Sequence, residues 1–166
     1  MQRIRFVLWC FVVIGLQTSF AQSKAGDIAV SKLPAEVKQV LEEYVNILTS
    51  SKDLDECAQR FTSIAGGGLI NEDPVNVTLR QTVQPFSLKK DFNNIKFYAQ
   101  PVKVTRVNVS KTGGSGYGAS AVAGTIYKIW IDKKDPKQGM PAPVSIVVPE
   151  NHSTIKTPKV MNIGSF

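Results

Sequence analysis

Apolar residues recur every three or four positions over residues 33–48, and this spacing predicts an amphipathic helix. The apolar stripe consists of Leu33, Val37, Val40, Leu41, Tyr44, Ile47 and Leu48. Pro34 suits the first turn, and the charged residues fall on the opposite side. This segment carries the strongest periodic signal in the chain.

A second helix is predicted to begin at Asp53, because Asp53 and Glu56 have the spacing of a capping box. Its apolar stripe extends from Leu54 to Ala65. Gly66, Gly67 and Gly68 follow and are predicted to end it, since glycine readily takes the left-handed conformation found after helices.

The apolar positions after Pro85 fit a third helix, which is predicted to end between Asn94 and Ala99. Residues 95–99 also alternate, so the start of a strand there remains open. Before this helix, residues 69–71 are compatible with a short strand, and residues 72–74 (EDP) predict a turn.

From Pro101 onward the apolar period is two, which predicts strands. The phase changes between Thr105 and Arg106, and this slip predicts a β-bulge. A glycine-rich hairpin is expected at 111–118. The run 119–132 would span about 50 Å if straight, so it is predicted to bend at Gly124.

Two more strands are predicted, at 144–148 and 154–163, and Pro158 places the last one at a sheet edge. Helices followed by a strand meander favour an α+β fold, with N-terminal helices packed on one face of a bent antiparallel sheet.

The first 21 residues have the pattern of a cleavable export signal. Arg3 and Arg5 precede an apolar run at 6–15 that is too short to span a bilayer, and Ala21 occupies a small-residue cleavage position. The mature chain is therefore predicted to begin at Gln22, with a flexible lead-in over 22–32 and a single domain over 33–166. The predicted location is secreted or periplasmic; a retained signal anchor is the alternative.

Charge is distributed unevenly along the chain. Residues 22–84 carry 6 basic and 9 acidic groups, whereas residues 85–166 carry 12 basic and 4 acidic groups. This asymmetry is compatible with a site for an anionic ligand or surface, and also with lysines that solvate the outer face of a sheet. No nucleic-acid partner is expected, because the chain has no aromatic-basic repeat and is predicted to be exported.

The order of elements, with the segments EVKQVLEEYVNIL, GGGLINED and QPFSLKKDFNNIKFYAQPVKVTRV, resembles the nuclear-transport-factor-two-like superfamily. The resemblance covers nearly all of the mature chain. It implies a cone of three helices wrapped by a bent sheet. Enzymes of that superfamily, such as ketosteroid isomerases, place acidic and tyrosine side chains in the cone, but no catalytic position matches here residue by residue, so no activity is carried over.

Several motifs do not support the chemistry that they suggest. GYGASA at 116–121 fits a dinucleotide fingerprint, but a strand pattern follows it where a helix is required. Cys57 lies on an apolar stripe, and the single histidine, His152, lies far away in a turn. With one histidine and one mature cysteine, neither a zinc site nor any cofactor is expected.

Carboxylates and phenols are the remaining candidates for acid-base chemistry. The carboxylates are Glu43, Asp91 and Asp132, and the phenols are Tyr44, Tyr98 and Tyr127. Ala119, Ala121 and Ala123 share a strand face, which leaves open whether they line a cavity or seat a helix.

These patterns favour a non-enzymatic exported module that holds a small apolar or anionic ligand, or a protein partner, between sheet and helices. The predicted contacts are Tyr44, Phe92, Tyr98, Tyr127 and Trp130, with Arg106, Lys128, Lys89 and Lys90 as anion partners. One alternative is an assembly subunit that forms a homodimer through an apolar sheet strip around Trp130. Another is a cavity enzyme of isomerase or hydratase type with a carboxylate of raised pKa.

Overall fold

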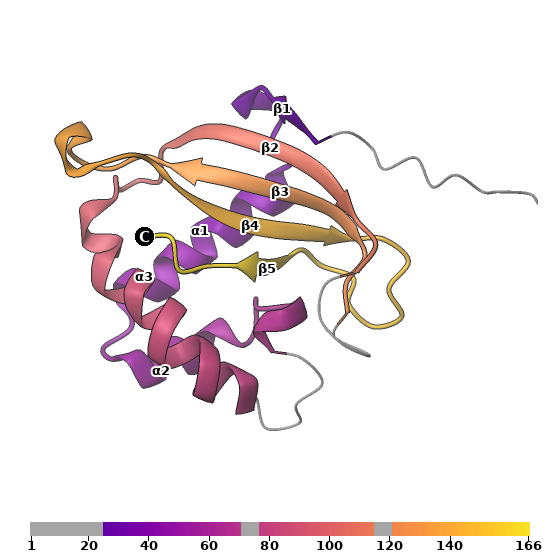
Figure 1. The fold of residues 1–166 in the computed structure, drawn as a ribbon, viewed down its shortest axis with the longest axis horizontal. Coiled ribbons are helices and arrows are strands. Elements are labelled where there is room, and N and C mark those ends of the chain that lie inside the picture. Colours follow the sequence, from indigo (N-terminus) through magenta and orange to yellow (C-terminus); the bar gives the residue numbers. More distant parts are fainter. Residues whose placement is uncertain (1–24, 71–76, 115–120) are drawn as a thin grey trace, which may run out of the picture.

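The computed structural model describes residues 25–70, 77–114 and 121–166, and its helices pack on one face of a five-stranded antiparallel sheet (Figure 1). This arrangement confirms the predicted α+β class. The sheet does not close into a barrel, since its two edge strands, β1 and β5, do not pair with each other. The predicted export signal lies outside the described residues.

The first two helices follow the predicted patterns. Helix α1 spans Ala35–Ser50, and helix α2 spans Leu54–Phe61. The Asp53 side chain caps α2, accepting a hydrogen bond from the Glu56 amide at 2.8 Å. Helix α2 ends at Phe61, before the glycines, and the chain then turns to meet the sheet, where Ala65 forms a parallel bridge with Val160.

The third helical region begins earlier than predicted. A π-helical segment, η3, spans Leu79–Leu88 and continues into α3 (Lys89–Asn94) and the short 3₁₀ segment η4 (Ile95–Phe97). The buried positions of η3 are Leu79, Val83 and Leu88. Spacings of four and five fit a wider helix, and Pro85 is accommodated inside it. The predicted end between Asn94 and Ala99 is confirmed; within 95–99, residues 95–97 are helical and Tyr98 forms an isolated antiparallel bridge with Lys133.

The sheet is a simple meander with the order β1-β2-β3-β4-β5. Its strands are β1 (Gly26–Ile28), β2 (Val104–Thr112), β3 (Gly124–Ile131), β4 (Ala142–Pro149) and β5 (Lys159–Asn162). The register shifts between Val104 and Arg106, which confirms the predicted bulge. At the start of β3, Gly124 has a φ of +157°, and a Cβ there would lie 2.1 Å from the Val148 carbonyl oxygen. This contact requires glycine where a bend was predicted.

Four segments differ from the sequence expectations. The lead-in contains strand β1, which pairs with β2, and the last strand is only four residues long, although it does form the predicted sheet edge. Residues 67–69 form a 3₁₀ turn, not a strand. Residues 121–123 precede β3 without regular structure. The predicted EDP turn at residues 72–74, the second half of the glycine-rich hairpin and most of GYGASA lie outside the described residues.

The core lies between the helices and the inner face of the sheet. From α1 it takes Val37, Leu41, Tyr44, Ile47 and Leu48, and from the sheet Val107, Ile129, Ile131, Val144 and Ile146. A smaller cluster of Val122, Val147 and Met161 forms separately. Among the described helices, none is long and apolar enough to cross a membrane.

Candidate functional site

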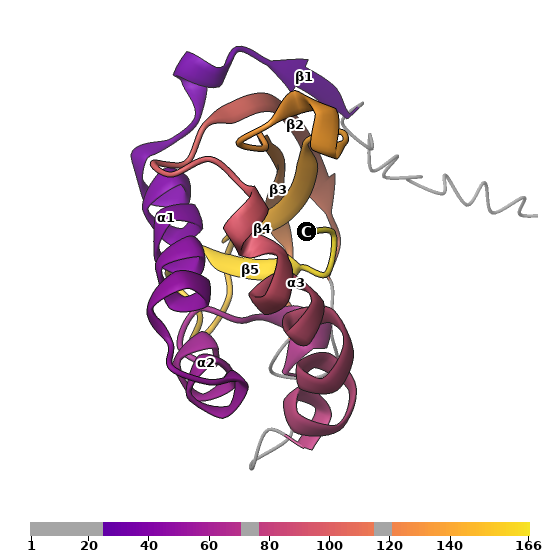
Figure 2. The ribbon, with the colours of Figure 1, turned by 90° about the vertical axis from the view of Figure 1, so that its left-hand side faces the viewer.

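The segment after β5 is inserted between the sheet and the helices. Figures 1 and 2 show this segment, Ile163–Phe166 (the tail segment), turning away from β5 toward α3. The Phe166 side chain is buried, with 4% of its surface exposed. Its ring centroid lies 4.6 Å from that of Tyr98 and 6.0 Å from that of Tyr44. Phe166 therefore occupies the concavity in which the sequence predicted a ligand.

A buried carboxylate holds the tail segment. Asp91 on α3 is completely buried, and its two oxygens accept three hydrogen bonds. One comes from the Tyr44 hydroxyl (2.7 Å to Oδ2), one from the Gly164 amide (2.7 Å to Oδ2) and one from the Phe166 amide (2.9 Å to Oδ1). Two of the three donors thus belong to the tail segment.

Helix α3 adds further contacts to the same segment. The Lys90 ammonium donates to the Gly164 carbonyl at 2.8 Å, and the Asn94 amide donates to the Phe166 oxygen at 3.0 Å. Gly164 has a φ of +91°, and a Cβ there would lie 2.8 Å from the Cβ of Ser87. We call the site formed by Tyr44, Asp91, Asn94 and Tyr98 the tail seat; it fits a main chain that passes close to η3.

The electrostatics of the tail seat are dominated by burial. Desolvation raises the pKa of Asp91 above its ordinary value, although the three hydrogen bonds favour the charged form. Burial, with the neighbouring Asp91, also raises the pKa of Tyr44 well above its ordinary value. The tail seat therefore pairs a phenol that stays protonated with a carboxyl that holds its proton more tightly than a carboxyl in water.

The other predicted contacts on the inner side are packed in the core. Phe92 and Tyr127 are partly buried against it, and Tyr98 is 1% exposed. Tyr127 lies opposite Val109 and Ile146 in the sheet. Tyr44 and Tyr98 thus lie beside Phe166 of the tail segment, and Phe92 packs against the same core.

Arg106, Lys128 and Trp130 lie elsewhere, on the outer face of the sheet, because they alternate with the buried Val107, Ile129 and Ile131 along β2 and β3. The Arg106 guanidinium lies 4.6 Å from the Trp130 ring centre, and the Lys128 ammonium lies 5.2 Å from it. The structure does not bring these three residues together with the tyrosines.

Arg106 is also engaged by another partner. Its guanidinium forms two hydrogen bonds to Asp27 of β1, at 3.0 and 3.1 Å. These bonds, with one from Asn108, hold the pKa of Asp27 below its ordinary value. Arg106 thus fastens the short edge strand to the sheet, which is a structural role.

The remaining candidates lie apart from the tail seat or are inert. Glu43 is exposed on α1, and Asp132 pairs with Lys103 at 2.8 Å. Cys57 is completely buried, and burial raises the pKa of its thiol to about 11. His152 Nδ1 accepts hydrogen bonds from two amides of its own turn. In the part of the chain that the structure describes, no group of three potential metal ligands occurs.

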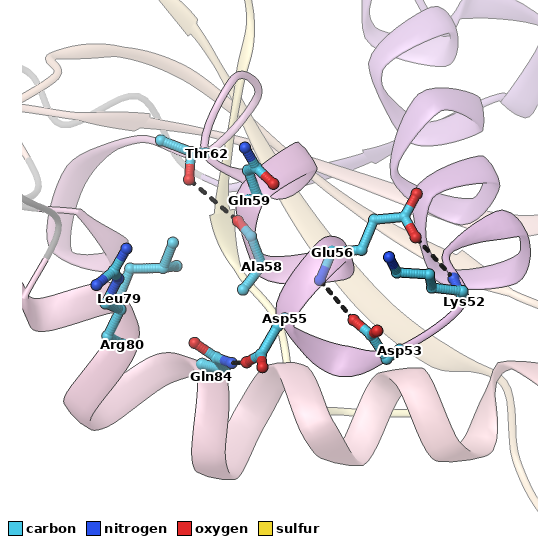
Figure 3. Close-up of a pocket in the computed structure, with 10 residues that line it drawn as sticks. All are labelled: Lys52, Asp53, Asp55, Glu56, Ala58, Gln59, Thr62, Leu79, Arg80 and Gln84. Atoms are coloured by element: carbon cyan, nitrogen blue, oxygen red, sulfur yellow. Dashed lines mark hydrogen bonds between the residues drawn. The ribbon is translucent and has the colours of Figure 1, made fainter.

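A hollow lies away from the tail seat, between α2 and η3 (Figure 3). It has a volume of about 960 Å³ and is open to solvent. Its lining is polar, with Lys52, Asp53, Asp55, Glu56, Gln59, Thr62, Arg80 and Gln84 beside Ala58 and Leu79. Asp55 accepts a hydrogen bond from Gln84 across the hollow at 2.5 Å. Both signs of charge line it, so it favours no ligand class.

Sequence reasoning identified Tyr44, Tyr98 and Asp91 but missed Gly164 and Phe166. In the sequence, the run NIGSF at 162–166 shows a glycine and a phenylalanine after the last strand pattern, but nothing in it indicates which residues they contact. Comparison of the chain with protein-family models, curated proteins and solved structures found no match.

Proposed function

We propose that this protein is an exported, non-catalytic binding module that holds one small aromatic or apolar ligand in the tail seat, in exchange for the tail segment. The observation that carries the proposal is Asp91. It is a fully buried carboxylate, and two of its three hydrogen bonds go to the tail segment, not to a helix or strand.

A buried carboxylate is an unfavourable way to build a core. Apolar residues of similar volume commonly give equal or greater stability, whereas a carboxylate needs all of its hydrogen-bond partners in place. The tail segment supplies two partners without pairing in the sheet, since β5 ends at Asn162. A ligand that brings a ring and two N–H or O–H donors would satisfy the same groups.

The chemistry of the tail seat narrows the ligand class. Tyr44 and Tyr98 lie against the Phe166 ring, so a planar apolar group fits the place of Phe166. Asp91 favours a donor and repels an anion in its charged form. Of the two ligand classes expected from the sequence, the apolar one is favoured at this site.

A cavity enzyme is the second candidate, because Asp91 is a buried carboxyl of raised pKa that lies 2.7 Å from a phenol. It ranks below the binding module because no catalytic position of the resembled superfamily is matched residue by residue in this sequence. Assembly through the sheet ranks third, since Arg106 and Lys128 lie over Trp130 and interrupt the apolar strip.

Membership of the nuclear-transport-factor-two-like superfamily remains part of this proposal. What supports it is the packing of three helices on an open antiparallel sheet, together with a buried acid and phenol between the layers. The parallel bridge of Ala65 with Val160 also brings the chain after α2 alongside the sheet.

Native mass spectrometry tests the proposal. The chain from Gln22, purified from its own host, is compared with the same sample after denaturation. We expect one equivalent of a small aromatic or apolar molecule in the native spectrum alone, and higher occupancy in Phe166→Ala, where the competing ring is absent. Phe86→Ala is the matched control, because that ring is 69% exposed. The absence of any bound small molecule from the native spectra of both the parent chain and Phe166→Ala would contradict the proposal.

A further inference from the structure

The helical region η3–α3–η4 exposes apolar and basic side chains together. Phe86 is 69% exposed, although a phenylalanine is usually buried, and Phe97 is 38% exposed. Lys89 and Lys96 are exposed between them. Positions 86, 89, 93, 96 and 97 recur at helical spacing, so these side chains lie along one side of the helical region over about 16 Å.

A second exposed segment lies beside the end of this region. The turn between β3 and β4 contains the 3₁₀ segment η6 (Pro136–Gln138). It is fastened to η4, because the Lys134 amide donates to the Phe97 carbonyl at 2.9 Å. Figure 2 looks onto this side of the molecule, with the turn directly above α3. The turn adds Met140, which is 85% exposed, and the exposed Lys134 and Lys137.

The charge of this surface is almost entirely positive. Within residues 85–100 the only acid is Asp91, and it is completely buried. In the turn, Asp132 pairs with Lys103, and Asp135, which caps η6 by accepting from the Lys137 amide, is the one exposed carboxylate of the described residues 131–140. The ammonium groups of Lys90 and Lys133 are engaged, because each donates a hydrogen bond to a carbonyl oxygen.

Four exposed lysines remain: Lys89, Lys96, Lys134 and Lys137, and the Lys96 ammonium lies 5.2 Å from the centre of the exposed Phe97 ring. None of them forms an ion pair with a described residue. We call Phe86, Met140 and these four lysines the lysine-phenylalanine face. Part of the excess of basic residues over 85–166 lies on this face.

We propose that the lysine-phenylalanine face docks on an anionic lipid surface. Positive charge complements anionic headgroups, and exposed Phe86 and Met140 insert at the boundary between headgroups and acyl chains. Protein interfaces are poor in lysine and use arginine for their cations, whereas all four cationic residues of this face are lysines. The hollow beside Phe86, which Lys89, Lys90 and Asn93 help to line, is wide open to solvent. These features favour a lipid surface over an acidic protein.

Vesicle flotation tests the proposal with the chain from Gln22, because every described core residue lies within 25–166 and the apolar export run would itself bind lipid. Vesicles of phosphatidylcholine alone are compared with vesicles containing phosphatidylglycerol. We expect binding only to the anionic vesicles, and its loss when salt is raised until charges are screened.

Three variants locate the contact. Each lysine near an anionic surface contributes roughly fivefold to binding, so K89Q/K96Q/K137Q is expected to bind roughly 100-fold more weakly. The charge-matched control, K32Q/K38Q/K52Q, removes three lysines from η1 (Val30–Lys32), α1 and the α1–α2 connection and is expected to bind nearly as the parent does. F86S/M140S is expected to lose at least tenfold at constant charge, whereas V30S, at an exposed valine, is expected to lose little.

Equal losses in the two lysine triples would overturn the proposal, because net charge alone would then explain binding. Binding that F86S/M140S leaves unchanged would also overturn it, since no apolar insertion would occur. If the vesicles fail to bind but polyaspartate binds with the same lysine dependence, the partner is an acidic protein and the lipid surface is excluded.

Discussion

Replacement of Phe166 by alanine is expected to destabilise the domain strongly, although Phe166 lies beyond the last strand. The ring is 4% exposed and lies within aromatic contact distance of both Tyr98 and Tyr44. Truncation of a buried phenylalanine commonly costs about 3–5 kcal/mol of unfolding free energy. In a domain of this size, 1 kcal/mol lowers Tm by roughly 3–5 °C, so Tm should fall by roughly 10–20 °C.

The geometry also sets an upper limit to this loss. If the shortened tail segment leaves the tail seat as a unit, the cost cannot exceed the free energy with which that segment docks. Asp91 would then exchange two hydrogen bonds from the tail segment for water, and the loss would equal the docking free energy of the whole segment. The expected value therefore lies at the lower end of the range if the segment detaches.

Chemical denaturation, followed by tryptophan fluorescence and circular dichroism, measures the loss. Phe86→Ala is the control for removing a phenyl ring, and at 69% exposure it should change the unfolding free energy by less than about 0.5 kcal/mol. Equal, small effects of the two variants would refute the reasoning, because Phe166 would then not be seated in solution.

Three further predictions concern the tail seat and its neighbours. Asp91→Asn should destabilise the fold by about 2–4 kcal/mol, because one of its two oxygens becomes a donor facing other donors. Burial raises the pKa of Asp91, so its protonated form stabilises the fold fully below about pH 3.8, and this stabilisation is lost as pH rises through the folded-state pKa. The stability difference between the wild type and Asp91→Asn should therefore shrink from pH 4 upward in urea titrations; a difference that grows with pH would contradict the pKa direction. Gly164→Ala should cost about 1–3 kcal/mol, since φ is +91° and the new Cβ meets Ser87, and S87G should recover only the steric part of the loss in thermal melts. Cys57 should react with a thiol reagent slowly in the native state and rapidly in denaturant, because its thiol is buried with a pKa of about 11; fast native labelling would mean that α2 opens.

Local patterns were sufficient to predict the helices α1 and α2 and the bulge in β2. The Asp53 cap and the phase change at Thr105 each depend on residues within a few positions, so the sequence displays them directly. Pro85 was less informative. Proline is frequent in the first turn of a helix, yet here it lies inside a π-helical segment whose start falls six residues earlier.

Long-range placement was not encoded in any local pattern. The residues Gly164 and Phe166 reach Asp91 across more than seventy positions, and nothing near them in the sequence indicates that contact. The position of Trp130 and Lys128 on the outer face could be predicted more readily from the sequence. Tyr127 and Lys128 are neighbours on one strand, and neighbours point to opposite faces, so they cannot line one pocket.

The central claim is that the tail segment occupies a site which a ligand can take. Hydrogen exchange of residues 163–166, measured by mass spectrometry with and without the small-molecule extract of the host, tests it most directly. Because the Gly164 and Phe166 amides donate to Asp91, they should exchange slowly in the bare chain and clearly faster when ligand displaces the tail segment, while the amides of α1 stay protected. Unchanged slow exchange at saturating extract would contradict the claim and would leave Phe166 as a permanent part of the core.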